Sequence, residues 1–270
     1  MPKKKREKES KFWKYLGKGI LFIIKIPYYT VKGVIKLIQQ VSKKSEENKV
    51  KKKRESIKAT FSAFRVVETI EGDYNQWFDK VIGSDSQIGL IIGARGSGKT
   101  ALGIKFIENI YAKNKEKCFA MGFKPEEFPS WIKVISDISG IENDSWVLID
   151  EGGILFNSRS SMSSANKMLS QLILISRHKN LNILFISQNS SNLEVNILRQ
   201  ADFLILKNSS LLQKDFERKI IQRIYSETKD KFKKYEKDKG LAYIYSEKFR
   251  GFVSNPLPSF WKEEISKSFK

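Results

Sequence analysis

The feature that most constrains this chain is an octapeptide at residues 93–100, GARGSGKT. It matches the pattern G-x-x-x-x-G-K-[S/T], in which glycines let successive backbone N–H groups turn toward one anion. An apolar run precedes it at 88–92 (IGLII), and a stretch with helical character follows over 98–113. This context predicts a phosphate-binding loop (P-loop), and it restricts the chain to an α/β fold with a largely parallel sheet.

The P-loop is predicted to bind ATP and Mg²⁺. Lys99 should place its ammonium between the β- and γ-phosphates, the Thr100 hydroxyl should be a Mg²⁺ ligand, and the helix N-terminus adds its positive end. The alternative, a chance glycine-rich turn, does not explain the flanking strand and helix. The residues expected to surround the nucleotide are Gly93, Ala94, Arg95, Gly96, Ser97, Gly98, Lys99, Thr100 and Ala101.

An acidic pair is predicted to complete this site. Residues 145–149 (SWVLI) form a candidate buried strand that delivers Asp150 and Glu151 to its carboxyl end, the edge where such sheets bind ligands. We expect Asp150 to hold Mg²⁺ through its water shell and Glu151 to polarise the attacking water. Such a pair can also simply begin a turn. Its position 51 residues after Lys99, with room for intervening strands, favours nucleotide hydrolysis.

The remaining pattern predicts strands at 117–121, 132–135, 182–187 and 202–206, helices at 163–178 and 212–239, and a closing hairpin of 241–246 and 249–253. It assigns no element between residues 59 and 86. The 182–187 strand ends at Gln188, whose amide can sense the γ-phosphate or the attacking water. The alternative is a turn formed by the Gln-Asn-Ser-Ser stretch.

The net charge of +20 belongs to the two ends of the chain. Residues 1–58 hold 19 Lys+Arg and 5 Asp+Glu, residues 59–211 hold 16 of each, and residues 212–270 hold 15 and 9. Basic flanks of this kind indicate a polyanionic partner, either nucleic acid or an anionic membrane surface. We therefore divide the chain into a basic segment at 1–58 and an ATPase domain at 59–270. The motor core of this domain spans about 85–210, and a helix and hairpin occupy 211–270.

The basic segment contains a stripe of lysines beside apolar faces. Lysines recur at 11, 18, 25 and 32, a spacing that returns to nearly the same side of a helix. Pro27 and the short lysine-free runs make a membrane-spanning helix the weaker prediction. Residues 11–43 are therefore expected to form an amphipathic helix on an anionic membrane surface, or else a helix pair packed on the core or on a neighbouring subunit. Residues 42–58 form a charged linker, helical or disordered.

Cysteine usage favours a reducing compartment. Cys118 has no partner for an internal disulfide, and the first ten residues lack the apolar core of a secretory signal. We expect an intracellular, cytoplasmic protein that is peripheral to a membrane or associated with a virion.

The motifs together resemble a known group of ATPases. A P-loop, an Asp-Glu pair after a strand and a polar residue closing the intervening strand are typical of the additional-strand branch of P-loop NTPases. The run from Val147 to Lys207 resembles the HerA/FtsK superfamily, in particular viral genome-packaging ATPases and zonula-occludens-toxin-like phage assembly ATPases. The features that carry the resemblance are Asp150–Glu151 followed by Phe156 and Arg159, Arg177–His178 before a strand, and Ser187–Gln188 at its end.

This resemblance implies a RecA-like P-loop NTPase with a mostly parallel sheet flanked by helices, carrying the basic amphipathic helical extension in front. It also implies a homo-oligomeric ring, commonly a hexamer, in which an arginine of one subunit completes its neighbour's ATP site. Arg177 is the favoured arginine finger, and Arg159 and Arg199 are the alternatives.

Three functions are consistent with these observations. The first is an ATP-driven translocase of double-stranded DNA for viral genome packaging or mobile-element transfer. The second is a membrane-associated assembly or secretion ATPase that acts on protein subunits. The third, which the placements of Glu151 and Gln188 disfavour, is a P-loop kinase or nucleotide switch.

Overall fold

The computed structural model describes residues 14, 36, 39–40, 42–152 and 162–267. The chain divides into two compact units, 1–53 and 54–270, and each is considered by itself. Residues 42–56 are helical, which settles the conformation of most of the charged linker. The lysine stripe at 11–43 lies almost entirely outside the described residues. Within the described part of the chain, no helix combines the length and the apolar character needed to cross a membrane.

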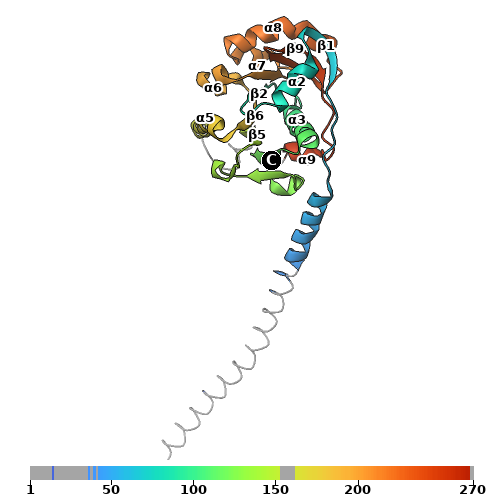
Figure 1. Ribbon diagram of the computed structural model, residues 1–270, viewed down its shortest axis with the longest axis vertical. Helices are drawn as coiled ribbons and strands as arrows, with labels where there is room; N and C mark the ends of the chain where they lie inside the picture. Colours follow the sequence, from blue (N-terminus) through green and yellow to red (C-terminus); the bar gives the residue numbers. More distant parts are fainter. Residues whose placement is uncertain (1–13, 15–35, 37–38, 41, 153–161, 268–270) are drawn as a thin grey trace, which may run out of the picture. The chain divides into compact units, whose positions relative to one another are not determined.

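The described strands form one nine-stranded sheet (Figure 1). Its order is β1 (Arg65–Gly72), β9 (Phe249–Ser254), β8 (Leu241–Ser246), β7 (Phe203–Leu206), β2 (Ile88–Ile92), β6 (Leu181–Ser187), β5 (Ser145–Asp150), β3 (Lys117–Met121) and β4 (Ile132–Ile135). The six strands from β7 to β4 are parallel, and β8, β9 and β1 add antiparallel pairs. Strand β6 lies between β2 and β5, as in additional-strand P-loop NTPases. The predicted fold class is confirmed.

Helices cover both faces of this sheet (Figure 1). On one face lie α2 (Tyr74–Ile82), α3 (Lys99–Asn114) and the short α9 (Glu263–Lys267). On the other lie α5 (Met162–Lys179), α6 (Val195–Gln200) and α8 (Lys219–Lys234), with α7 (Leu211–Phe216) packed against α8. The described residues also form three short 3-10 turns, η1 (Pro125–Glu127), η2 (Ile138–Gly140) and η3 (Ser190–Asn192).

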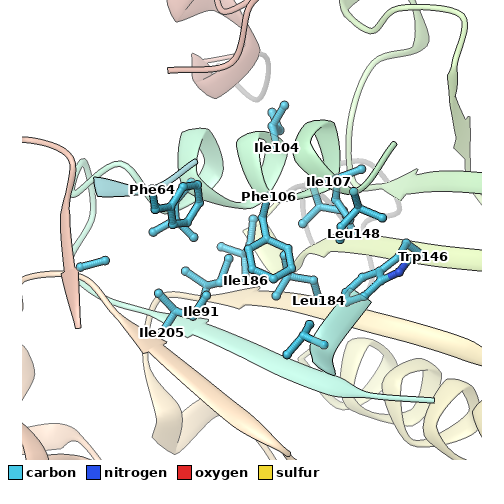
Figure 2. Packing of buried hydrophobic residues seen from close by; sticks show 14 of the residues in the cluster. Phe64, Ile91, Ile104, Phe106, Ile107, Trp146, Leu148, Leu184, Ile186 and Ile205 are labelled. Carbon is cyan, nitrogen blue, oxygen red and sulfur yellow. The ribbon is translucent and has the colours of Figure 1, made fainter. Parts of the chain in front are cut away.

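The P-loop helix α3 is fixed against the sheet by aromatic packing (Figure 2). The Phe106 ring lies between helix and sheet, with its centroid 5.8 Å from Trp146 and 6.1 Å from Phe203. Earlier in α3, a Cβ on Gly103 would lie only 3.0 Å from the Cδ1 atoms of Ile186 and Leu148. Glycine therefore allows the helix to approach the strands closely, and this approach sets the position of the P-loop.

The predicted strands and the closing hairpin are confirmed within a residue or two, and so are the helices expected at 98–113 and 163–178. Strand β1 and helix α2 occupy the stretch to which the sequence pattern assigned nothing.

The single helix predicted at 212–239 is wrong, because the chain breaks into α7 and α8. The break falls at Glu217, whose backbone is extended (φ −73°, ψ 162°). Its buried carboxylate accepts hydrogen bonds from the backbone N–H and the hydroxyl of Ser190, far away in the sequence. A tertiary contact therefore overrides the local preference for a continuous helix.

Candidate functional site

The P-loop joins the carboxyl end of β2 to the start of α3. Gly96 and Gly98 have left-handed backbones, with φ of 76° and 88°, which residues with a side chain rarely adopt. The loop is closed by a hydrogen bond from Ser97 N–H to the Ala94 carbonyl (3.1 Å) and anchored by one from Ala94 N–H to the Asn208 carbonyl (3.0 Å). No side chain caps the N-terminus of α3, so its first N–H groups can bind an anion.

Lys99 is folded back into this loop. Its side chain is buried, and Nζ donates hydrogen bonds to the carbonyls of Gly93 (2.8 Å) and Ala94 (2.9 Å). Burial lowers the pKa of Lys99 to about 8, although Asp150, Glu151 and Glu217 oppose this shift. The ammonium is therefore still charged at neutral pH, within the cradle where phosphates would lie.

Thr100, in the first turn of α3, contacts Asp150 at the carboxyl end of β5. The Thr100 hydroxyl donates to Oδ2 of Asp150 (3.1 Å), and the N–H of Gly152 donates to Oδ1 (3.1 Å). Hydroxyl and carboxylate oxygens are the ligands that Mg²⁺ prefers. The two residues thus fit the metal role predicted for them.

Glu151 follows directly and is also buried. The Ser187 hydroxyl at the end of β6 donates to its Oε2 (2.6 Å). Burial raises the pKa of Glu151, while the hydrogen bonds from Ser187 and the Gln188 backbone lower it. A carboxylate held in this way at the strand ends can accept a proton from a bound water once it is ionised.

Gln188 reaches the same edge but has an exposed side chain. Its backbone carbonyl accepts a hydrogen bond from the amide of Gln213 in α7, and that amide also donates to Oε1 of Glu217 (2.8 Å). Helix α7 therefore supports the loop that carries Gln188. Sequence reasoning gave no role to Ser187, Gln213 or Glu217. Ser187 entered only as part of the family resemblance, although its place at a strand end could have indicated a role, whereas the other two carry no local signal.

The structure does not bring the candidate arginine fingers to the site of their own chain. Arg177 lies in the last turn of α5 and Arg199 in the last turn of α6, and both are exposed. These helices end just before β6 and β7 begin, so both arginines lie at the amino ends of the strands, opposite the P-loop edge. Arg159 lies outside the described residues, as does Phe156. The arginine finger stays a prediction that needs a second subunit.

No protein-family model and no curated protein matches the chain. Among solved structures, it is similar to B204, the DNA-packaging ATPase from Sulfolobus Turreted Icosahedral Virus, with 16% identity, a TM-score of 0.45, and coverage of 64% of this chain and 98% of that chain. The genome packaging NTPase B204 from Sulfolobus turreted icosahedral virus 2, in complex with ATP-gammaS, gives 17% identity and a TM-score of 0.45 over 64% and 98% of the two chains.

A more distant likeness is to ATPases 2 and 3 of EssC from Geobacillus thermodenitrificans. It has 11% identity and a TM-score of 0.39, and it covers 79% of this chain and 48% of that chain.

Proposed function

We propose that this chain hydrolyses ATP and uses the reaction to move double-stranded DNA, in viral genome packaging or in the transfer of a mobile element. One observation carries the hydrolytic part of this proposal. The buried Glu151 carboxylate, held by Ser187, directly follows Asp150, which contacts Thr100 of the P-loop. The site thus combines a phosphate cradle with a base for water.

The residues divide the reaction between them. The P-loop N–H groups and Lys99 bind the phosphates, and Thr100 with Asp150 would hold Mg²⁺, which neutralises phosphate charge. Glu151 takes a proton from water as the water oxygen bonds to the γ-phosphorus. The bond from that phosphorus to the β–γ bridging oxygen breaks, and ADP and phosphate are released. Gln188, at the end of the intervening strand, is suited to orient the water.

Charge distribution supports DNA as the polymer. The ATPase core is neutral, whereas the flanks are basic, which suits sequence-independent contact with phosphates. We further propose a homo-oligomeric ring, with six subunits as the family resemblance implies. In such a ring Arg177, Arg199 or Arg159 would face a neighbour's ATP.

A second candidate function is a membrane-associated assembly or secretion ATPase that acts on protein subunits. The lysine stripe at 11–43 favours it, since lysines beside aromatic and aliphatic residues suit the surface of an anionic membrane. In either case we propose an intracellular location, peripheral to a membrane or associated with a virion.

The test is ATPase activity of the full chain with and without double-stranded DNA and anionic vesicles, at low and high salt, with Glu151→Gln as the control. The DNA proposal expects stimulation by DNA that weakens with salt. Activity that DNA does not stimulate, together with no salt-sensitive DNA binding, would overturn it. Stimulation by vesicles alone would favour the second candidate. Phosphorylation of an added acceptor in place of hydrolysis would overturn both in favour of a kinase.

A further inference from the structure

Lys207 is a buried cation that the proposed reaction does not use. It follows β7, the strand that borders β2 on the side away from β6. Its side chain is only 1% exposed. Nζ donates hydrogen bonds to the backbone carbonyl of Lys239 (3.1 Å) and to Oδ1 of Asn255 (3.3 Å). Both acceptors are neutral, so these contacts do not balance the charge of an ammonium.

The same side chain lies against the P-loop. A Cβ built on Gly98 would be 3.6 Å from Cε and 3.8 Å from Nζ of Lys207, and one on Gly93 would be 2.7 Å from its Cβ. The backbone is fixed as well, because Lys207 N–H donates to the Ile92 carbonyl (2.8 Å) and the Tyr225 hydroxyl donates to the Lys207 carbonyl (3.0 Å). Lys207 is therefore held beside the loop that would receive the phosphates.

The buried ammonium of Lys207 has little negative charge around it. Asp238, before β8, is the acid that attracts it, and burial lowers the pKa of Lys207 to about 7 against that attraction. The P-loop itself carries Lys99, a cation of like sign. The Tyr225 hydroxyl donates to the backbone carbonyls of Lys207 and Ile92. A further anion nearby would therefore stabilise the charged form of this ammonium. Nucleotide phosphates in the P-loop would supply one.

We infer that Lys207 is a second cation of the nucleotide site, a positioning residue that packs against the P-loop at Gly98 and whose charge strengthens the binding of a polyphosphate. This inference rests on the proposed nucleotide binding. It implies that phosphates favour the charged form of Lys207, so that ATP binding takes up protons near neutral pH. As the pH rises above about 7 the ammonium loses its proton, and ATP affinity should fall.

The test is calorimetric titration of the full-length Lys207→Met protein with AMP, ADP and ATP. Methionine keeps the length of the side chain without its charge. The matched control is Lys239→Met, whose ammonium is on an exposed side chain and whose backbone carbonyl acceptor remains. Lys207→Met should weaken ATP and ADP binding roughly tenfold and AMP binding less, as expected for the loss of a charged partner. Lys239→Met should bind all three like the wild type.

Repeating the titrations at pH 7.5 in buffers of different ionisation enthalpy measures proton uptake. The wild type should take up protons with ATP, and Lys207→Met should take up fewer. If Lys207→Met does not fold, Asp238→Asn can be tested in its place, and the expected change in proton uptake has the opposite sign. Loss of that acid leaves less ammonium before binding, so proton uptake should increase.

Unchanged ATP affinity in Lys207→Met, or an equal loss for AMP, ADP and ATP, would overturn the inference. The inference would also be overturned if neither Lys207→Met nor Asp238→Asn changed the proton uptake that accompanies ATP binding. A wild-type protein that binds no nucleotide would instead overturn the proposed function, so the two failures are distinguishable.

Discussion

The Ser187 hydroxyl donates a 2.6 Å hydrogen bond to Oε2 of Glu151, and thereby joins the ends of two neighbouring strands. Strands β6 and β5 are paired in parallel, with Asp150 in register with Ile186, so both strands end at the same level of the sheet. The position of the proposed base is therefore set by sheet register, and hydrogen bonds from the Ser187 hydroxyl and the Gln188 backbone fix its orientation.

Replacing Ser187 with alanine should shift the pH dependence of hydrolysis. The hydrogen bond from Ser187 favours the ionised form of Glu151, whose pKa burial raises. Without that bond the pKa of Glu151 rises further. Because Glu151 must be ionised to accept a proton, activity falls as the pH drops through its pKa, and this fall should begin at a higher pH in Ser187→Ala. Profiles of kcat against pH check this.

The matched control for that prediction is Ser191→Ala. The Ser191 hydroxyl also donates a hydrogen bond to a side-chain oxygen, here Oδ1 of Asn189 (2.7 Å) and not an oxygen of Glu151. On the acidic side of the profile, kcat of Ser191→Ala should fall at the same pH as kcat of the wild type. If kcat of Ser187→Ala and of the wild type fall at the same acidic pH, the role given to Ser187 is contradicted.

Glu151→Gln should separate ATP binding from hydrolysis. Glutamine keeps the shape of the side chain but cannot take a proton, so kcat should fall by about 10²- to 10⁴-fold while ATP still binds. Lys99→Ala provides the contrast, since it removes the P-loop cation and should abolish productive binding. ATPase assays and calorimetry measure the two properties. Normal turnover by Glu151→Gln would remove Glu151 from its assigned role.

Much of this site could be predicted from the sequence because its signals are local. The P-loop lies between an apolar run and a helix, and Asp150 and Glu151 end a buried strand. Strands β2, β3, β5, β6 and β7 are short apolar runs that are largely buried on both faces, which makes such runs conspicuous. Strand β1 gives no such signal, because most of its residues are exposed at the sheet edge and it is defined by pairing with β9.

The parts that could not be predicted depend on contacts between distant residues. Glu217 lies within a stretch of continuous helical character, and only its contact with Ser190 explains the break there. Lys207 follows β7 at the same sheet edge as the P-loop, so its position could have been inferred. Its complete burial could not, because Lys239 and Asn255 come from the antiparallel end of the domain.

Gly103→Val should destabilise the domain by about 1–3 kcal/mol, the usual cost of overpacking. Even the Cβ would meet side chains of β5 and β6 at 3.0 Å, and the extra methyl groups would push α3 away from the sheet. Gly140→Val is the control, because a Cβ there meets its nearest atom, in Ile135, at 3.6 Å. Urea unfolding measures both free energies. Equal effects of the two substitutions would show that helix–sheet packing is not responsible.

Glu108→Gln should cost about 3 kcal/mol or more of unfolding free energy, because it breaks a buried ion pair. Glu108 lies 2.9 Å from Lys105 in α3, and the two side chains are 0% and 2% exposed. The same carboxylate accepts the backbone N–H groups of Thr60 (3.1 Å) and Ser259 (3.0 Å), so it pins two distant segments to the P-loop helix.

The control for that substitution is Glu227→Gln. Its pair with Arg223 in α8 is long (3.7 Å) and both side chains are more than half exposed, so unfolding should be unchanged. Urea unfolding of both variants gives the comparison. Equal stability of Glu108→Gln and the wild type would mean that the segments around Thr60 and Ser259 are held to α3 by apolar packing rather than by this carboxylate.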